Sequence, residues 1–121
     1  CKVIKLSKNG ERNITMTKLR HRDEELVYEA GMTLRTQEDC RHFFEDICTI
    51  KELQAISQRM RVACLLDSGS NYLEVSEATG ASSATISRVN RCLNYGSGYR
   101  EAIDNLKKAG KLNDDGSNLG K

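Results

Sequence analysis

Apolar residues recur every three or four positions from Leu26 to Leu106, and the chain contains no proline. This spacing matches the turn of an α-helix, and proline is the residue that most strongly breaks one. No stretch alternates between apolar and polar residues for long enough to form a convincing strand. The sequence therefore predicts an all-α protein.

Residues that cap helices divide this region into six predicted helices. Thr49 and Glu52 have the spacing of a capping box, in which each side chain accepts a hydrogen bond from the backbone amide of the other residue. Gly69 is expected to end the long helix that follows, because glycine readily adopts the left-handed conformation found there. The other expected elements are a first helix with an apolar stripe over 26–34, a helix capped by Thr36, a short helix over 72–79, a helix from Ser82 to Gly96 and a last helix capped by Ser97.

The composition is that of a globular domain, because 30% charged residues leave enough polarity for a hydrated surface. Domains of this size bury only about 60–65% of the surface that their unfolded chains expose, so pairing of two subunits would complete a thin core. No run of 18 apolar residues occurs, and the chain does not start with the apolar stretch of a secretion signal. We therefore expect a cytoplasmic protein without a membrane partner.

The five cysteines do not form a recognisable site. They include no CxxC pair, and their number is odd, which argues against a disulfide framework. Cys40, Cys64 and Cys92 lie beside apolar residues at helical spacing and are expected to be small buried hydrophobes. The two histidines, His21 and His42, do not supply the close ligand pairs of a zinc site. No metal and no cofactor are expected.

Charge is distributed unevenly along the chain, although the net charge is only +2. Residues 1–22 carry seven Lys or Arg against one Glu, and residues 23–58 carry nine acids against three bases. We expect residues 1–20 to form a basic, flexible arm or extension, with 21–108 as the helical domain and 109–121 as a flexible tail. Met16 resembles a natural start, so residues 1–15 are expected to lie outside the fold.

Residues 72–91 have the pattern of a helix-turn-helix. A tight corner between two helices needs positive φ at one residue, and Gly80 supplies it. Val75, Ile86 and Val89 fall where the two helices must pack together. Ser76 is small at the position where the helices approach most closely.

The second helix of this motif, over 82–93, has an exposed face suited to DNA. Short hydroxyls allow its backbone to enter a major groove, and arginine forks can bind bases or phosphates. No acid occurs between Ala78 and Arg100. The alternative is an ordinary helical corner with a serine-rich cap. The predicted DNA-binding residues are Tyr72, Ser76, Ser82, Ser83, Ala84, Thr85, Ser87, Arg88 and Arg91.

From about Met16 to Leu106 the chain resembles the Trp-repressor-like family, in its YerC/YecD branch. The resemblance rests on the stretches CRHFFEDICTIKELQ at 40–54, QRMRVA at 58–63 and TGASSATISRVNRCLNYG at 79–96. It implies a six-helix subunit in an intertwined homodimer. It also implies two helix-turn-helix motifs that enter successive major grooves of a near-palindromic operator.

The resemblance further implies a small-molecule effector pocket. The Trp repressor holds tryptophan between two arginines beside two threonines, and the matching residues here are Arg59, Arg88, Thr49 and Thr85. A guanidinium can bind a carboxylate through two hydrogen bonds, which suits an amino-acid ligand. The alternative for Arg59 is a surface salt bridge with a nearby glutamate.

Three substitutions in the matching region argue against tryptophan as the ligand. Val89 occupies the position where the repressor has a glycine against which the indole lies, and its branched side chain should fill part of the slot. Asp46 and Cys48 replace two leucines of the pocket wall, which makes the wall more polar. We hypothesise that any effector is a different molecule.

The sequence thus predicts a dimeric, sequence-specific transcriptional regulator, expected to act as a repressor on double-stranded DNA. Alternatives are a tryptophan-responsive Trp repressor, a DNA-binding module of a replication or transposase-type protein, and a protein–protein adaptor. We do not expect an enzyme, because His42 follows Cys40 by only two helical positions, so their side chains point to different faces. No HExxH motif or phosphate-binding glycine loop is present either.

Overall fold

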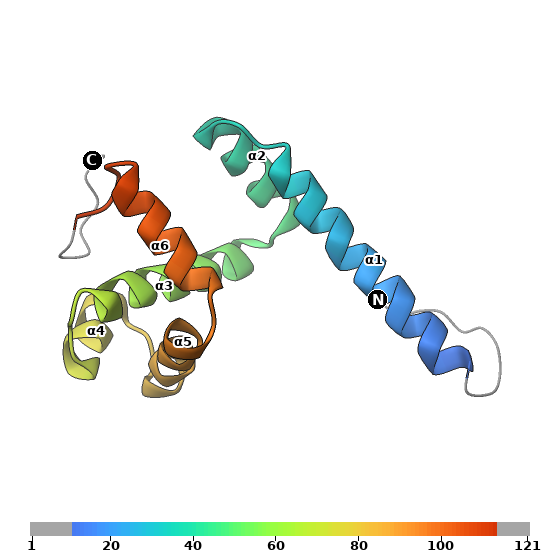
Figure 1. Cartoon of the computed structure of the whole chain (residues 1–121). Coiled ribbons are helices and arrows are strands. Elements are labelled where there is room, and N and C mark those ends of the chain that lie inside the picture. The colour runs from blue at the N-terminus through green and yellow to red at the C-terminus, as the bar shows by residue number, and fades with distance from the viewer. Residues whose placement is uncertain (1–10, 114–121) are drawn as a thin grey trace. The chain divides into compact units, whose positions relative to one another are not determined.

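The computed structural model describes residues 11–113, with side chains from Arg22 onward, and contains six α-helices in this range (Figure 1). No strand occurs in this part of the chain, which confirms the predicted all-α class. The helices are α1 (Glu11–Met32), α2 (Gln37–Ile47), α3 (Ile50–Asp67), α4 (Tyr72–Thr79), α5 (Ser83–Tyr95) and α6 (Gly98–Lys108).

The first helix is longer than its apolar stripe predicts. Helix α1 begins at Glu11, ten residues before the expected domain boundary at residue 21. The stretch between Glu11 and Ala30 contains neither glycine nor proline, so backbone propensity supports a helix even where apolar periodicity is weak. Leu34, the last residue of the expected stripe, lies beyond the end of α1 at Met32. Residues 1–10 of the predicted arm and 114–121 of the predicted tail lie outside the described residues.

Local hydrogen bonds at the helix N-termini confirm the predicted caps of α2 and α3 and correct the one predicted for α6. Thr49 and Glu52 form the capping box, with the Glu52 amide donating to Thr49 Oγ1 over 3.1 Å and the Thr49 amide donating to Glu52 Oε1 over 2.8 Å. At the start of α2, the Asp39 amide donates to Thr36 Oγ1 over 3.0 Å. Ser97 precedes α6 but makes no side-chain cap hydrogen bond, because its ψ of −18° departs from the extended conformation that capping needs.

The described part of the chain divides into two compact units, one that ends at Ile47 and one that begins at Cys48. We call α1 and α2 the N-terminal helical pair, and α3 to α6 the four-helix body. In the body, α3 contacts each of the other three helices, as expected for a helix that is apolar on more than one side. The core consists of Val62, Ala63, Cys64, Val75, Ala81, Ile86, Val89, Leu93 and Ile103.

The predicted burial of the cysteines is only partly correct. Cys64 is buried in the core and Cys40 is half-buried, but Cys92 is exposed. Leu93 takes the core-facing position of that turn, and successive residues of a helix are rotated by about 100°, so the side chain of Cys92 is directed away from the core.

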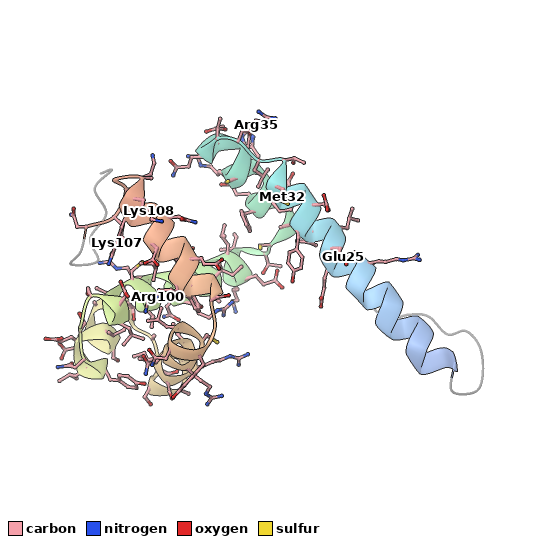
Figure 2. The ribbon with its side chains drawn as sticks, in the orientation of Figure 1. Glu25, Met32, Arg35, Arg100, Lys107 and Lys108 are labelled. Carbon is pink, nitrogen blue, oxygen red and sulfur yellow. The ribbon has the colours of Figure 1, made fainter. Side chains whose placement is uncertain are left out.

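An acidic side chain ties the end of α3 to α6 within the body. Asp67 Oδ2 accepts a hydrogen bond from Lys107 Nζ over 2.9 Å, and Asp67 Oδ1 accepts one from Arg100 Nη1. Figure 2 shows Arg100 and Lys107 along α6. The Asp67 side chain is only 10% exposed, and this burial raises its pKa. The hydrogen bonds from Lys107 and Arg100 outweigh burial and leave the pKa of Asp67 below its ordinary value.

Candidate nucleic-acid interface

The corner between α4 and α5 has the geometry that the sequence predicts. Gly80 adopts φ 76°, in the left-handed region, and its amide donates to the Ser76 carbonyl over 2.8 Å. Val75 and Ile86 are 0% exposed and Val89 is 1% exposed, so the three predicted packing residues are all buried. We call residues 72–95, which comprise α4, the corner and α5, the head.

Side-chain hydrogen bonds lock this corner from within. The Ser76 hydroxyl donates to the Ala81 carbonyl over 3.1 Å, and the Thr79 hydroxyl donates to the Val75 carbonyl over 2.7 Å. The Ala81 amide in turn donates to Thr79 Oγ1 over 3.1 Å. Ser76 is half-buried, so its hydroxyl serves the corner, and its predicted contact with DNA stays a prediction.

The first turn of α5 is capped by Ser82. The Thr85 amide donates to Ser82 Oγ over 3.2 Å, and the Ser82 hydroxyl donates to Thr85 Oγ1 over the same distance. Ser82 is exposed and Thr85 is half-buried. The capping bond pins both side chains at the N-terminal end of α5, where backbone amides are also available to an anion.

The outward face of α5 is exposed, polar and free of acids. Ala84, Ser87, Arg88 and Arg91 follow the helical spacing of three and four residues that places side chains on one face. Neither Arg88 nor Arg91 forms a salt bridge with any described residue, so both guanidinium groups keep their donors available. Ser83 is also exposed, and Tyr72 is exposed in the first turn of α4.

The predicted effector residues have different environments. The hydroxyl and amide of Thr49 are both used in the capping box, and Val89 lies in the core. Arg59 is half-buried and pairs with no described carboxylate, so the alternative of a salt bridge with a glutamate is not seen. Arg88 is exposed and Thr85 is half-buried.

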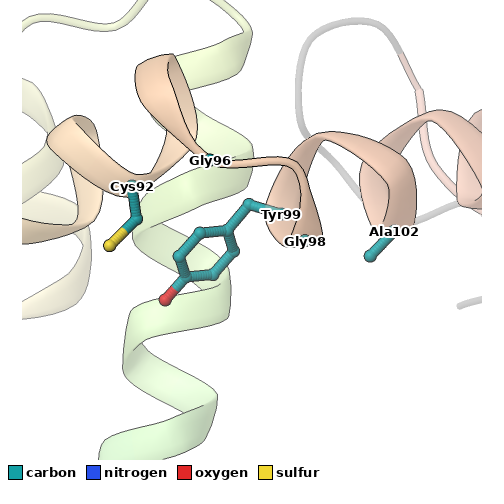
Figure 3. A pocket seen from close by; sticks show the side chains of 5 residues that line it. All are labelled: Cys92, Gly96, Gly98, Tyr99 and Ala102. Carbon is teal, nitrogen blue, oxygen red and sulfur yellow. The ribbon is translucent and has the colours of Figure 1, made fainter.

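One open surface pocket of the body lies at the junction of α5 and α6 and has a volume of about 410 Å³ (Figure 3). It is lined by Cys92, Gly96, Gly98, Tyr99 and Ala102. None of the five predicted effector residues lines this pocket. Among the described residues, no group of three or more His, Cys, Asp or Glu side chains could hold a metal ion. In the same range, no helix combines the length and hydropathy needed to cross a membrane.

Two contacts of the head were not predicted from the sequence. Asn71 and Glu74 form a second capping box at the start of α4, which the Asn-x-x-Glu spacing could have indicated. The Gln58 side chain of α3 donates from Nε2 to the Thr79 carbonyl over 3.1 Å. No local pattern indicates this second contact, because the two residues are 21 positions apart.

Comparison with known proteins gives consistent matches. Residues 24–107 match the Trp repressor protein family. The uncharacterized protein YerC of Bacillus subtilis is 45% identical over 92 residues, which cover 75% of this chain and 88% of YerC. A TrpR-like protein from Eubacterium eligens has a crystal structure with a TM-score of 0.69 and 43% identity, covering 80% of this chain and 98% of that one. A provisionally assigned Trp repressor from Staphylococcus aureus gives a TM-score of 0.69 and 39% identity, covering 76% of this chain and 93% of that one.

Proposed function

Since the chain belongs to the Trp repressor family of DNA-binding regulators, we propose that it represses transcription by reading a near-palindromic operator through the helix over 82–93. The observation that carries this proposal is the outward face of α5, where Arg88 and Arg91 stand among exposed small residues and no acid occurs in the sequence between Ala78 and Arg100. Small side chains let a helix sit deep in the major groove, and unpaired arginines can bind guanine edges or phosphates. The proposed role needs no catalytic group, and such a protein acts on the chromosome in the cytoplasm.

The proposed regulator is a homodimer. Leu26, Tyr28, Met32, Phe44 and Ile47 of the N-terminal helical pair are all exposed in the single chain. Several large apolar side chains exposed on two neighbouring helices of the sequence favour an interface, and a second copy of the chain would cover them. Two heads in a symmetric dimer would read half-sites about 34–36 Å apart, one turn of DNA.

We further propose that any effector of this regulator differs from tryptophan. Val89 is buried in the core, so the flat surface that a glycine would offer to an indole ring is absent at this position. Arg59 and Arg88 still provide guanidinium groups for a carboxylate-bearing molecule. Isothermal calorimetry with L-tryptophan should show no binding at micromolar concentration, and micromolar affinity would contradict this part of the proposal.

Selection of bound duplexes from a random pool tests the main proposal. The full chain should enrich a near-palindromic sequence, and a gel shift with that duplex should show nanomolar affinity at physiological salt. The same selection with a mixture of amino acids would detect an effector other than tryptophan. Enrichment of no sequence, together with no binding to random duplex, would favour the alternative of a protein–protein adaptor.

A further inference from the structure

The C-terminal end of α4 is held by a side chain from another helix. The last carbonyls of a helix have no partners within it, so other donors must satisfy them. The Gly80 amide donates to the Ser76 carbonyl, which is one of these, and the Thr79 hydroxyl adds a hydrogen bond to the Val75 carbonyl one residue earlier. The Thr79 carbonyl accepts its hydrogen bond from Gln58 Nε2.

This contact differs in kind from the other contacts between α3 and the head. In the described part of the chain, Gln58 makes the one side-chain hydrogen bond that joins α3 to the head. The same helices also share an apolar core cluster, which includes Val62 of α3 and Val75 of α4. Apolar burial is non-directional, whereas a hydrogen bond depends strongly on distance and angle. The amide of Gln58 is therefore suited to fix the orientation of the head on α3.

The position of Gln58 allows this hydrogen bond to influence the orientation of α5. Gln58 lies one turn before Val62, so both side chains leave the same side of α3. Its acceptor, Thr79, is the last residue of α4 and directly precedes the Gly80 corner. Because Ser76, Thr79 and Ala81 lock that corner, a rotation at Thr79 would carry α5 with it.

We propose that Gln58 is a positioning residue for DNA recognition, which holds α5 at the angle that base readout requires. This inference rests on the proposed function. Binding to random DNA depends on sequence-independent attraction to the phosphates, whereas an operator is selected through contacts with base edges in the groove. Loss of the Gln58 hydrogen bond should therefore weaken operator binding much more than binding to random DNA.

The test compares Gln58→Met with Gln54→Met in the 121-residue chain. The first variant removes the donor at nearly constant side-chain volume, and the second makes the same change at an exposed residue one turn earlier on α3. We expect Gln58→Met to lower affinity for the selected operator about tenfold. Each of the two heads in the dimer loses the net contribution of one hydrogen bond to its orientation. Affinity for random duplex should change less than about twofold, and Gln54→Met should match the wild type in both assays.

A second pair of variants keeps the test decisive if Gln58→Met unfolds. Gln58→Lys retains a donor for the Thr79 carbonyl, whereas Gln58→Glu replaces it with a carboxylate that the carbonyl repels. The ratio of operator to random-DNA affinity should stay within about threefold of wild type for Gln58→Lys and fall about tenfold or more for Gln58→Glu. Equal ratios for the two variants, or an unchanged ratio for a folded Gln58→Met, would overturn the inference. Failure of the wild-type chain to bind any duplex would instead overturn the proposed function.

Discussion

The four-helix body and the N-terminal helical pair use similar apolar residues with opposite results. In the body, nine apolar side chains are buried, and Ile86 and Ile103 are both 0% exposed. In the N-terminal pair, no described side chain from Arg22 to Ile47 is buried, although Leu26 and Met32 are as apolar as the core residues. Figure 2 marks Met32 at the end of α1. An amphipathic helix thus needs a covering surface, which α3 to α6 provide for one another.

The largest expected effect is the loss of stability caused by a cavity in the four-helix body. Ile86→Ala should lower the free energy of unfolding by about 4 kcal/mol, because it removes methylene groups from a fully packed site. Urea denaturation followed by circular dichroism measures this loss. Val27→Ala in the N-terminal pair is the control, and it should change the same quantity far less. A loss below about 1 kcal/mol for Ile86→Ala would show that the body is not the stable unit.

The second-largest expected effect is a weaker dimer after a substitution in the N-terminal helical pair. Leu26 is 70% exposed in the single chain, so Leu26→Glu should leave the subunit folded. In the proposed dimer the same substitution buries a charge, and the dimer dissociation constant should rise at least about thirtyfold, roughly 2 kcal/mol. Analytical ultracentrifugation over a range of concentrations measures it. Glu25→Gln is the neighbouring control, and an unchanged constant for Leu26→Glu would place the dimer contact elsewhere.

A smaller effect on stability is expected at Asp67, whose hydrogen bonds connect α3 to α6. Asp67→Asn should lower the free energy of unfolding at pH 7 by about 1.5 kcal/mol, since two charge-assisted hydrogen bonds weaken but Arg100 is partly hydrated. The folded-state pKa of Asp67 lies below its ordinary value of 3.8, so its contribution is complete above that pH. It should disappear as pH falls through the lowered pKa. The free energies of unfolding of both proteins should therefore converge once the pH falls below that lowered pKa, whereas Glu101→Gln should differ little from wild type at pH 7 or at acidic pH.

The smallest effect on stability is expected on the outward face of α5. Arg91→Ala should change the free energy of unfolding by less than about 0.5 kcal/mol, because Arg91 is exposed and forms no salt bridge with a described residue. It should weaken binding to all duplexes and reduce the salt slope of binding by about one. Gel shifts at several salt concentrations give this slope. An unchanged slope would remove Arg91 from the phosphate-contacting residues.

Features that depend on neighbouring residues could be predicted from the sequence. The Thr49–Glu52 capping box and the Gly80 corner were both correct, because each is determined within about five residues. The burial of Val75, Ile86 and Val89 was also correct, since helical spacing assigns the inward face. The fold class followed from the same periodicity.

Features that join distant residues could not be predicted in this way. The partners of Asp67 lie 33 and 40 positions away, and nothing in the local sequence selects Arg100 and Lys107 over other cations. The contact between Gln58 and Thr79 could not be predicted for the same reason. The exposure of Cys92 was missed because periodicity places a residue only to within one helical position of the core.

Helix α5 divides its positions between two separate tasks. Ile86, Val89 and Leu93 are buried in the core, and Ala84, Ser87 and Arg91 are exposed. A protein engineer could therefore randomise the outward positions as a library and leave the interior trio constant. Such variants could prefer different DNA sequences while their core stays the same. A change in DNA specificity would then cost little thermal stability.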